Sequence, residues 1–261
     1  MTGLIAITRQ VSPAINQCEL THIERQPIDL LRAQSQHHEY EEALRSLGVE
    51  VVSLPPIPDL PDSVFVEDVA IALDECAIIT RPGADSRKPE TEFIAQVLSP
   101  YRKLFHILSP AIVDGGDVLT VGKTLFVGIS SRSNQDAIDQ MRMILSPYGY
   151  EVRGVEVTGC LHLKSAVTQV GGNQLLLNPE WVKKDDFPGM EFVEVDPSEP
   201  YAANAVMLGD AVIYPTAFPK TRTRLQAAGL KPVLVDASEL AKAEGAVTCC
   251  SIILKGPNAE N

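Results

Sequence analysis

The chain has 261 residues, 45% of them hydrophobic, which is enough for a sizeable core, and we expect a single domain over residues 1–261. Its net charge is −12 and no cluster of Lys and Arg is longer than a pair, so nucleic acid is not an expected partner. The chain has no run of about eighteen apolar residues and does not start like a signal peptide, so we expect a cytoplasmic protein with no membrane partner.

A short strand recurs along the chain at intervals of roughly forty to fifty-five residues, a period typical of repeat architectures. The five segments are 49–54 ("VEVVSL"), 103–108 ("KLFHIL"), 150–157 ("YEVRGVEV"), 191–195 ("EFVEV") and 232–235 ("PVLV"). Three of them follow a helical pattern that ends at Gly48, Gly149 or Gly229, where a glycine cap is expected. The fourth repeat is irregular, because "WVKKDDFPG" does not have a helical pattern.

Four β-hairpins are expected, each with a short turn containing Gly or Asp. Their paired strands are 66–73 with 76–80, 118–121 with 124–128, 166–170 with 174–177, and 205–208 with 211–214. A fifth pair has no turn, and its strands are expected at the two ends of the chain, Leu4–Thr8 and Val247–Leu254. Pairing these ends would close a ring and remove an exposed sheet edge. The sequence therefore predicts an α/β fold, a closed propeller of five repeats.

Polar side chains gather just before or at the first strand of each hairpin. They are Asp62, Glu67, Asp68, Asp114, Asp117, His162, Lys164, Asn204 and Cys249. Equivalent positions of a pseudo-symmetric ring converge on its axis, so we expect these groups to meet in a central pocket. A thiol beside an imidazolium is a nucleophile, and carboxylates hold a planar guanidinium through paired bonds. The combination suits attack on a guanidinium carbon.

Simpler explanations exist for each residue taken alone. A lone histidine in an apolar run is often a core or surface residue, and a Cys-Cys dipeptide is often two small buried residues. Adjacent cysteines lack the spacing of zinc ligands, so no metal site is expected. The chain has no glycine-rich nucleotide motif and no serine-hydrolase elbow. Five cysteines without regular spacing also argue against a disulfide framework.

The adjacent cysteines lie in the expected strand 247–254, where neighbouring side chains point to opposite faces. Cys250 shares its face with Ile252 and Leu254, which indicates packing. Cys249 shares the other, more mixed face with Ser251. The alternation slightly favours Cys249 as the residue that faces the pocket.

Six motifs occur in a fixed order: "DSVFVEDVAI", "ITRPGADSRKPE", "VDGGDVL", "FVGISSRSNQ", "LHLKSAV" and "TCCSIIL". Together they resemble the dimethylarginine dimethylaminohydrolase family of the pentein, or guanidino-group-modifying, superfamily. The resemblance extends from about residue 4 to residue 254. It implies a five-bladed α/β propeller, in agreement with the repeats.

The resemblance also implies roles for particular residues. Cys249 would be the nucleophile, His162 the proton donor and acceptor, and Asp114 the supporting carboxylate. The implied substrate-binding residues are Leu20, Asp62, Glu67, Asp68, Arg87, Arg132 and Ala243. Among these, the carboxylates would bind the guanidinium and amino groups, the two arginines the α-carboxylate, and the backbone carbonyls of the remaining two the α-amino group.

The implied activity is hydrolysis of Nω-methylated L-arginine to L-citrulline and an alkylamine, without a metal or organic cofactor. Two arginines opposite an acidic end fit a zwitterionic amino acid, whereas agmatine would leave them unpaired. Arginine deiminase is an alternative, although such enzymes tend to be longer, and so is a hydrolase of another N-substituted arginine. A non-catalytic propeller that only binds a partner is a third alternative. Besides the small-molecule substrate, a second copy of the chain is a possible partner.

Overall fold

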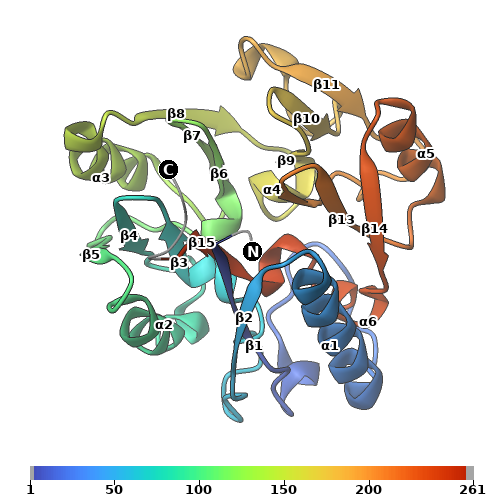
Figure 1. Cartoon of the computed structure of the whole chain (residues 1–261). Helices are drawn as coiled ribbons and strands as arrows, with labels where there is room; N and C mark the ends of the chain where they lie inside the picture. The colour runs from blue at the N-terminus through green and yellow to red at the C-terminus, as the bar shows by residue number, and fades with distance from the viewer. Residues whose placement is uncertain (1–2, 257–261) are drawn as a thin grey trace.

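The computed structural model describes residues 3–256. This part of the chain forms five three-stranded sheets around a common axis (Figure 1). In each sheet the middle strand pairs antiparallel with one neighbour and parallel with the other. In sheet order the strands are β15 (Ile252–Lys255), β1 (Leu4–Arg9) and β2 (Glu50–Leu54); β3 (Ala70–Ala72), β4 (Cys76–Ile79) and β5 (Lys103–His106); β6 (Val118–Val121), β7 (Thr124–Ile129) and β8 (Glu151–Glu156); β9 (Val167–Gln169), β10 (Gln174–Leu177) and β11 (Glu191–Glu194); and β12 (Val206–Leu208), β13 (Ala211–Pro215) and β14 (Lys231–Val235).

Four helices connect the middle strand of a sheet to its third strand and lie at the outside of the ring (Figure 1). They are α1 (Leu30–Ser46), α2 (Glu90–Leu98), α3 (Gln135–Leu145) and α5 (Pro219–Ala227). The fourth sheet has only the 3-10 turn Lys184–Asp186 at this place, as its irregular sequence predicts. Two single-turn helices, α4 (Leu163–Ala166) and α6 (Ser238–Ala241), stand elsewhere in the chain.

The expected glycine caps and the closure of the ring are both confirmed. Gly48, Gly149 and Gly229 have φ angles of 80°, 74° and 84°, which glycine adopts without a Cβ penalty. Strand β1 pairs antiparallel with β15, so that Ile5 lies opposite Leu254. Pairing of the two ends of the chain completes the five-bladed α/β propeller that the repeats predict.

Several expected strands are one or more residues shorter in the structure, and two of them begin with a helical turn instead. Residues Val66–Val69 form a 3-10 turn before β3, and Thr248–Cys250 form another before β15. Glu67 and Asp68 are acidic residues that disfavour a strand, whereas Thr248 is β-prone and its turn forms against that local preference. Cys249 and Cys250 therefore lie on a helical turn, and strand alternation does not decide which of them faces the pocket.

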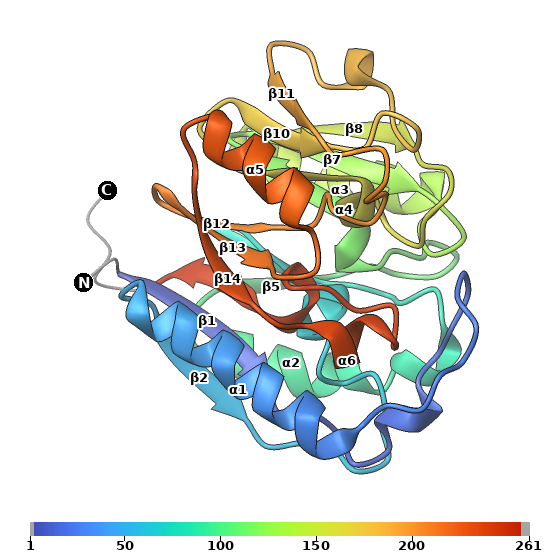
Figure 2. The ribbon, with the colours of Figure 1, turned by 90° about the vertical axis from the view of Figure 1, so that its right-hand side faces the viewer.

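Hydrophobic clusters fill the space between neighbouring blades and beneath the outer helices. In Figure 2 the blue segment that joins β1 to α1 reaches toward the loops of the last blade. Among the helices described, none has both the length and the apolar composition needed to cross a membrane.

Candidate active site

Four of the five innermost strands, β3, β6, β9 and β15, follow a short helical turn, and these turns contact one another near the axis. There they line a cavity of about 20 Å³. Eight of the ten predicted site residues border it: Asp62, Asp68, Arg87, Asp114, Arg132, His162, Ala243 and Cys249. Leu20 and Glu67 do not line this cavity. Of the nine polar residues that the repeats place in a central pocket, five border it, and Glu67, Asp117, Lys164 and Asn204 do not.

The imidazole of His162 lies between two carboxylates. Its Nε2 is 3.1 Å from Asp114 Oδ2, and its Nδ1 is 3.8 Å from Asp68 Oδ1. The second oxygen of Asp114 accepts the Gly83 N–H at 2.9 Å, which fixes the carboxylate. Burial alone would lower the pKa of His162, but the charge of Asp68 and the hydrogen bond to Asp114 raise it to about 9. The ring is thus an imidazolium at neutral pH.

The two glycines of "VDGGD" allow this close approach. A Cβ on Gly116 would lie 2.6 Å from His162 Nδ1 and 2.7 Å from Asp68 Oδ1. A Cβ on Gly115 would lie 2.0 Å from the carbonyl oxygen of Glu67. The N–H of Gly116 also donates to Asp68 Oδ1 at 3.1 Å. The motif is therefore needed for packing between two turns, and not only as a flexible turn.

Asp117, the last residue of that motif, is fully buried and braces the loop that carries His162. Its carboxylate accepts the hydroxyls of Ser130 and Ser133 at 2.7 and 2.6 Å and the N–H of Leu163 at 2.9 Å. Because Leu163 follows the histidine directly, these bonds fix where α4 begins. Asp117 does not line the cavity.

Cys249 and Cys250 have different surroundings. The side chain of Asn204 holds their turn, accepting the N–H of Thr248 at 3.0 Å and donating to its hydroxyl at 2.9 Å. Both cysteines belong to the same hydrophobic cluster, but Cys249 borders the cavity and Cys250 does not. Burial raises the pKa of the Cys249 thiol to about 12, and Asp68 and Glu67 act in the same direction. The resting thiol is therefore neutral.

One wall of the cavity is acidic. Burial raises the pKa of Asp62 to about 6, although Arg87 and the Glu19 N–H oppose that shift. The guanidinium of Arg87 is buried and already paired, with Asp68 and with Glu90, whose Oε2 accepts at 2.7 Å. It also donates to two backbone carbonyls. Its predicted role as a carboxylate ligand remains a prediction, and Glu90 is a partner that the sequence analysis missed.

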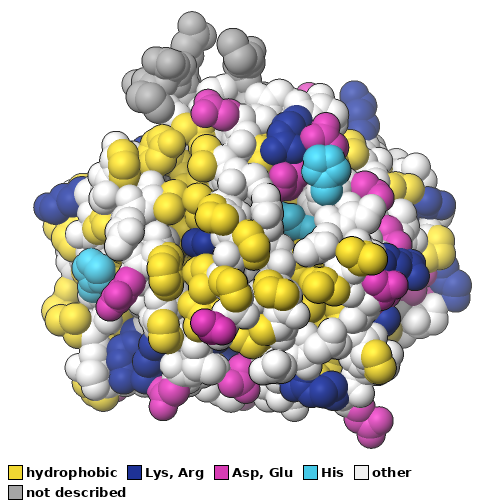
Figure 3. Space-filling view, turned by 90° about the horizontal axis from the view of Figure 1, so that it is seen from below, with side chains coloured by type: hydrophobic (Ala, Val, Ile, Leu, Met, Phe, Trp, Pro, Cys, Tyr) yellow, Lys and Arg dark blue, Asp and Glu magenta, His cyan; other side chains and the backbone are white. Residues whose placement is uncertain are grey.

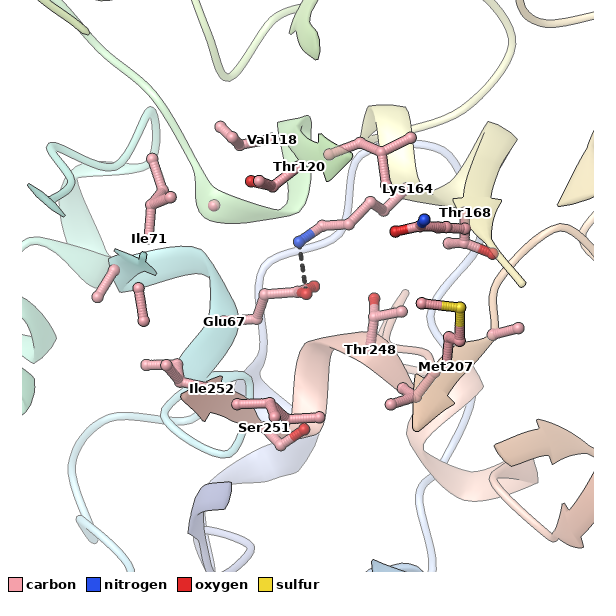
Figure 4. A pocket seen from close by; sticks show the side chains of 18 residues that line it. Glu67, Ile71, Val118, Thr120, Lys164, Thr168, Met207, Thr248, Ser251 and Ile252 are labelled. Atoms are coloured by element: carbon pink, nitrogen blue, oxygen red, sulfur yellow. Dashed lines mark hydrogen bonds and ion pairs between the residues drawn. The ribbon is translucent and has the colours of Figure 1, made fainter. Parts of the chain in front are cut away.

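Glu67 borders a different cavity from the one that contains Cys249 and His162. Its carboxylate forms an ion pair with Lys164, and both border a second cavity of about 260 Å³ (Figure 4). Side chains from all five inner strands line that cavity, among them Ile71, Thr120 and Met207. The predicted contact of Glu67 with the substrate remains a prediction.

A segment before α1 covers the small cavity, and we call residues 19–23 the lid. The Glu19 N–H donates to Asp62 Oδ2 at 3.1 Å, and Arg132 Nη2 donates to the Thr21 hydroxyl at 2.9 Å. Leu20 lies in this segment, packed partly against the core. Glu244, next to Ala243, accepts three backbone N–H groups of the lid. Nothing in the local sequence "AKAEGA" indicates this role.

The comparisons with known proteins agree with this site. A model of the family "N,N dimethylarginine dimethylhydrolase, eukaryotic" matches residues 8–187. The chain is 38% identical to the N(G),N(G)-dimethylarginine dimethylaminohydrolase of Pseudomonas aeruginosa, over 86% of this chain and 89% of that protein. It is 37% identical to the protein of that name from Streptomyces coelicolor, over 96% of each chain.

Solved structures give the same result. A mutant of the Pseudomonas aeruginosa enzyme in complex with citrulline superposes with a TM-score of 0.92 at 35% identity, covering 96% of this chain and 98% of that one. The amino-terminal domain of a cyanobacterial arginine dihydrolase superposes with a TM-score of 0.83 at 19% identity, which shows the shared fold alone. From the family model and the close relatives, the chain belongs to the dimethylarginine dimethylaminohydrolase family.

Proposed function

We propose that the protein hydrolyses Nω,Nω-dimethyl-L-arginine, and also the monomethyl compound, to L-citrulline and dimethylamine or methylamine. The observation that carries this proposal is the meeting of Cys249, His162 and an acidic wall in one buried cavity. A nucleophile, a charged imidazole and a cation-binding surface are the groups that this reaction needs. The names of the relatives support the same activity.

The acidic wall supports the choice of a cationic substrate. Burial raises the pKa of Asp62, which means that its negative charge is only partly compensated by the protein. A guanidinium bound beside Asp62 and Asp68 would supply the missing positive charge through paired hydrogen bonds. In the same way it would lower the pKa of the Cys249 thiol, so that the thiolate forms where the substrate is bound.

The first step exchanges the amine for sulfur. The Cys249 sulfur attacks the guanidinium carbon, and the C–N bond to dimethylamine breaks. His162 is an imidazolium at neutral pH and protonates the departing nitrogen, while the proton of the Cys249 thiol is released to solvent. The step leaves a cationic S-alkylthiouronium on Cys249, a neutral His162 and a free amine.

The second step restores the enzyme. His162, now neutral, takes a proton from water, and the hydroxide attacks the thiouronium carbon. The C–S bond breaks, the Cys249 sulfur takes the second proton of the water, and neutral citrulline leaves, with His162 again an imidazolium. Asp114 stays hydrogen-bonded to His162 and keeps the ring oriented through both steps.

The test is citrulline release from a small panel of guanidino compounds. We expect kcat/KM to be highest for dimethyl- and monomethylarginine, lower for arginine, and lowest for agmatine, which lacks the carboxylate. A preference for arginine would make the protein an arginine deiminase. Citrulline release that persisted undiminished in Cys249→Ser would contradict the proposed nucleophile.

Three further proposals concern the whole molecule: a single domain over residues 1–261, a cytoplasmic location, and a homodimer. Figure 3 shows hydrophobic side chains across the middle of one face, with most charged side chains nearer the rim. A contiguous apolar surface of this kind supports self-association. The charge of −12 argues against nucleic acid as a partner. Light scattering after size-exclusion chromatography would give the oligomeric state.

A further inference from the structure

The carboxylate of Glu244 binds three consecutive backbone N–H groups of the lid. Thr21 donates to Oε2 at 2.7 Å, and His22 and Ile23 donate to Oε1 at 2.5 and 3.1 Å. The two segments are more than two hundred residues apart in the sequence. Hydrogen bonds to an ionised carboxylate are stronger than neutral ones, so this one side chain is a substantial anchor for the lid.

The backbone of Glu244 is unusual as well. Within residues 3–256 it is the one residue other than glycine with a positive φ, at 56°. A side chain makes this left-handed conformation unfavourable, and a glycine would adopt it freely. Such outliers cluster at functional sites, where another interaction holds them in place. The three bonds to the lid are that interaction.

Glu244 joins two segments that both border the proposed substrate site. Ala243, its neighbour, lines the cavity beside Cys249, and Leu20 directly precedes the first lid residue that the carboxylate binds. The carbonyls of Leu20 and Ala243 are the groups expected to hold the α-amino group of the substrate. The spacing between them depends on how the lid is attached to residues 243–244.

We propose that Glu244 is a positioning residue that latches the lid to this turn and so sets the α-amino site. The proposal rests on the proposed function, and it makes Glu244 a determinant of specificity for free amino acids. Asp62 and Arg132 also form hydrogen bonds with the lid, to the Glu19 N–H and the Thr21 hydroxyl. The N–H groups of residues 21–23 bind Glu244 instead.

The variant Glu244→Gly tests the hydrogen bonds to the lid without disturbing the backbone of the turn. Glycine suits the φ of this position, so the turn should keep its conformation while the carboxylate is lost. Glu244→Gln keeps the length of the side chain and one acceptor oxygen, so its properties should lie between those of the wild type and those of Glu244→Gly. Asp210→Gly is a matched control, because Asp210 is exposed in the turn between β12 and β13 of another blade.

Hydrogen exchange tests the latch directly. We expect the amides of Thr21, His22 and Ile23 to exchange about 10-fold faster or more in Glu244→Gly. Exchange at these amides should not change in Asp210→Gly. Unchanged exchange in Glu244→Gly would overturn the latch, whatever the substrate of the enzyme is.

Kinetics test the effect on recognition. We compare dimethylarginine with its analogue that lacks the α-amino group, 5-(N′,N′-dimethylguanidino)pentanoate. In Glu244→Gly we expect KM for dimethylarginine to rise about 10-fold, kcat to change much less, and the preference over the analogue to shrink by a similar factor. Glu244→Gln should recover part of the preference. An unchanged preference would overturn the positioning role even if exchange is faster. If the wild type acts on neither compound, the proposed function fails, and exchange alone then decides whether the latch exists.

Discussion

The two cavities on the ring axis are built by neighbouring residues of the same repeats, yet they differ in size and chemistry. The cavity under the lid measures about 20 Å³ and is bordered by Cys249, His162 and Asp68. The cavity on the other side measures about 260 Å³ and is bordered by strand residues and by the Glu67–Lys164 ion pair. The larger space is therefore not the one with reactive groups.

The helical turns that precede the inner strands carry side chains to both cavities, since Asp68 and Cys249 border the smaller one and Glu67 the larger one. Strand side chains alternate between two faces, so the strands line the larger cavity with a mixture of apolar and polar groups. Cavity volume therefore does not locate the reactive groups.

The adjacent cysteines give the largest expected effect. Cys249→Ala removes the proposed nucleophile and should lower kcat for citrulline release at least about 10⁴-fold, as loss of a nucleophile does in other enzymes. Cys249 is buried in the same hydrophobic cluster as Cys250, so the free energy of unfolding should fall by about 1 kcal/mol. Citrulline release and urea unfolding of the same preparation measure both.

Cys250→Ala is the matched control for that variant. Cys250 is 1% exposed in the core, and removing its sulfur should lower the free energy of unfolding by about 1 kcal/mol. We expect kcat to stay within a few-fold of the wild type. If Cys250→Ala instead lost turnover while Cys249→Ala kept it, the two roles would be reversed.

Gly116→Ala should have the next largest effect. The added methyl group would meet His162 and Asp68, both held by other bonds, so the two turns would have to separate. We expect roughly a 100-fold loss of kcat/KM and about 2 kcal/mol less stability. Gly172→Ala, where a Cβ has nothing within 4 Å, is the control and should change neither quantity measurably. Similar losses in both variants would mean that glycine flexibility, and not close packing, matters.

Much of this architecture could be predicted from the sequence. Helical patterns ending in glycine, hairpin turns and evenly spaced strands are local signals, and they indicate the repeats correctly. The placement of polar residues at equivalent repeat positions predicts the meeting of His162 with Cys249, because symmetry converts a sequence pattern into a spatial one. Family resemblance assigned the individual roles.

Other features depend on contacts that no local pattern contains. Glu67 and Asp68 are adjacent in the sequence and were both expected in one pocket, but the 3-10 turn directs them to different cavities. Glu90 and Glu244 belong to a helix and a turn whose sequences are ordinary. Their partners are 3 and more than 200 residues away, and only the folded chain shows which carboxylate meets which donor.

Asp114→Asn should change the acid–base properties of the smaller cavity. Loss of the charge and of the hydrogen bond should lower the pKa of His162 from about 9 toward its ordinary value near 6.5. A raised pKa means that His162 stabilises the fold below about pH 6.5 and that this stabilisation is lost as pH rises through about 9. In the variant both that loss and the alkaline fall of kcat should move to lower pH, with kcat about 10-fold lower at pH 8. NMR titration of the His162 imidazole measures its pKa. An unchanged pKa would show that Asp68, and not Asp114, is the main cause of the raised value.

The Glu67–Lys164 pair should have the smallest effect on turnover. Lys164→Met leaves a partly buried carboxylate without its cation and should lower the free energy of unfolding by about 2 kcal/mol, and adding Glu67→Gln should restore most of that loss. Because the pair borders the larger cavity, kcat and KM of the double variant should stay within about 10-fold of the wild type. A larger rise in KM for Glu67→Gln alone, in a protein that remains folded, would mean that Glu67 contacts the substrate as the family resemblance implies. Residues that border the larger cavity would then also take part in substrate binding, and not only in stabilising the fold.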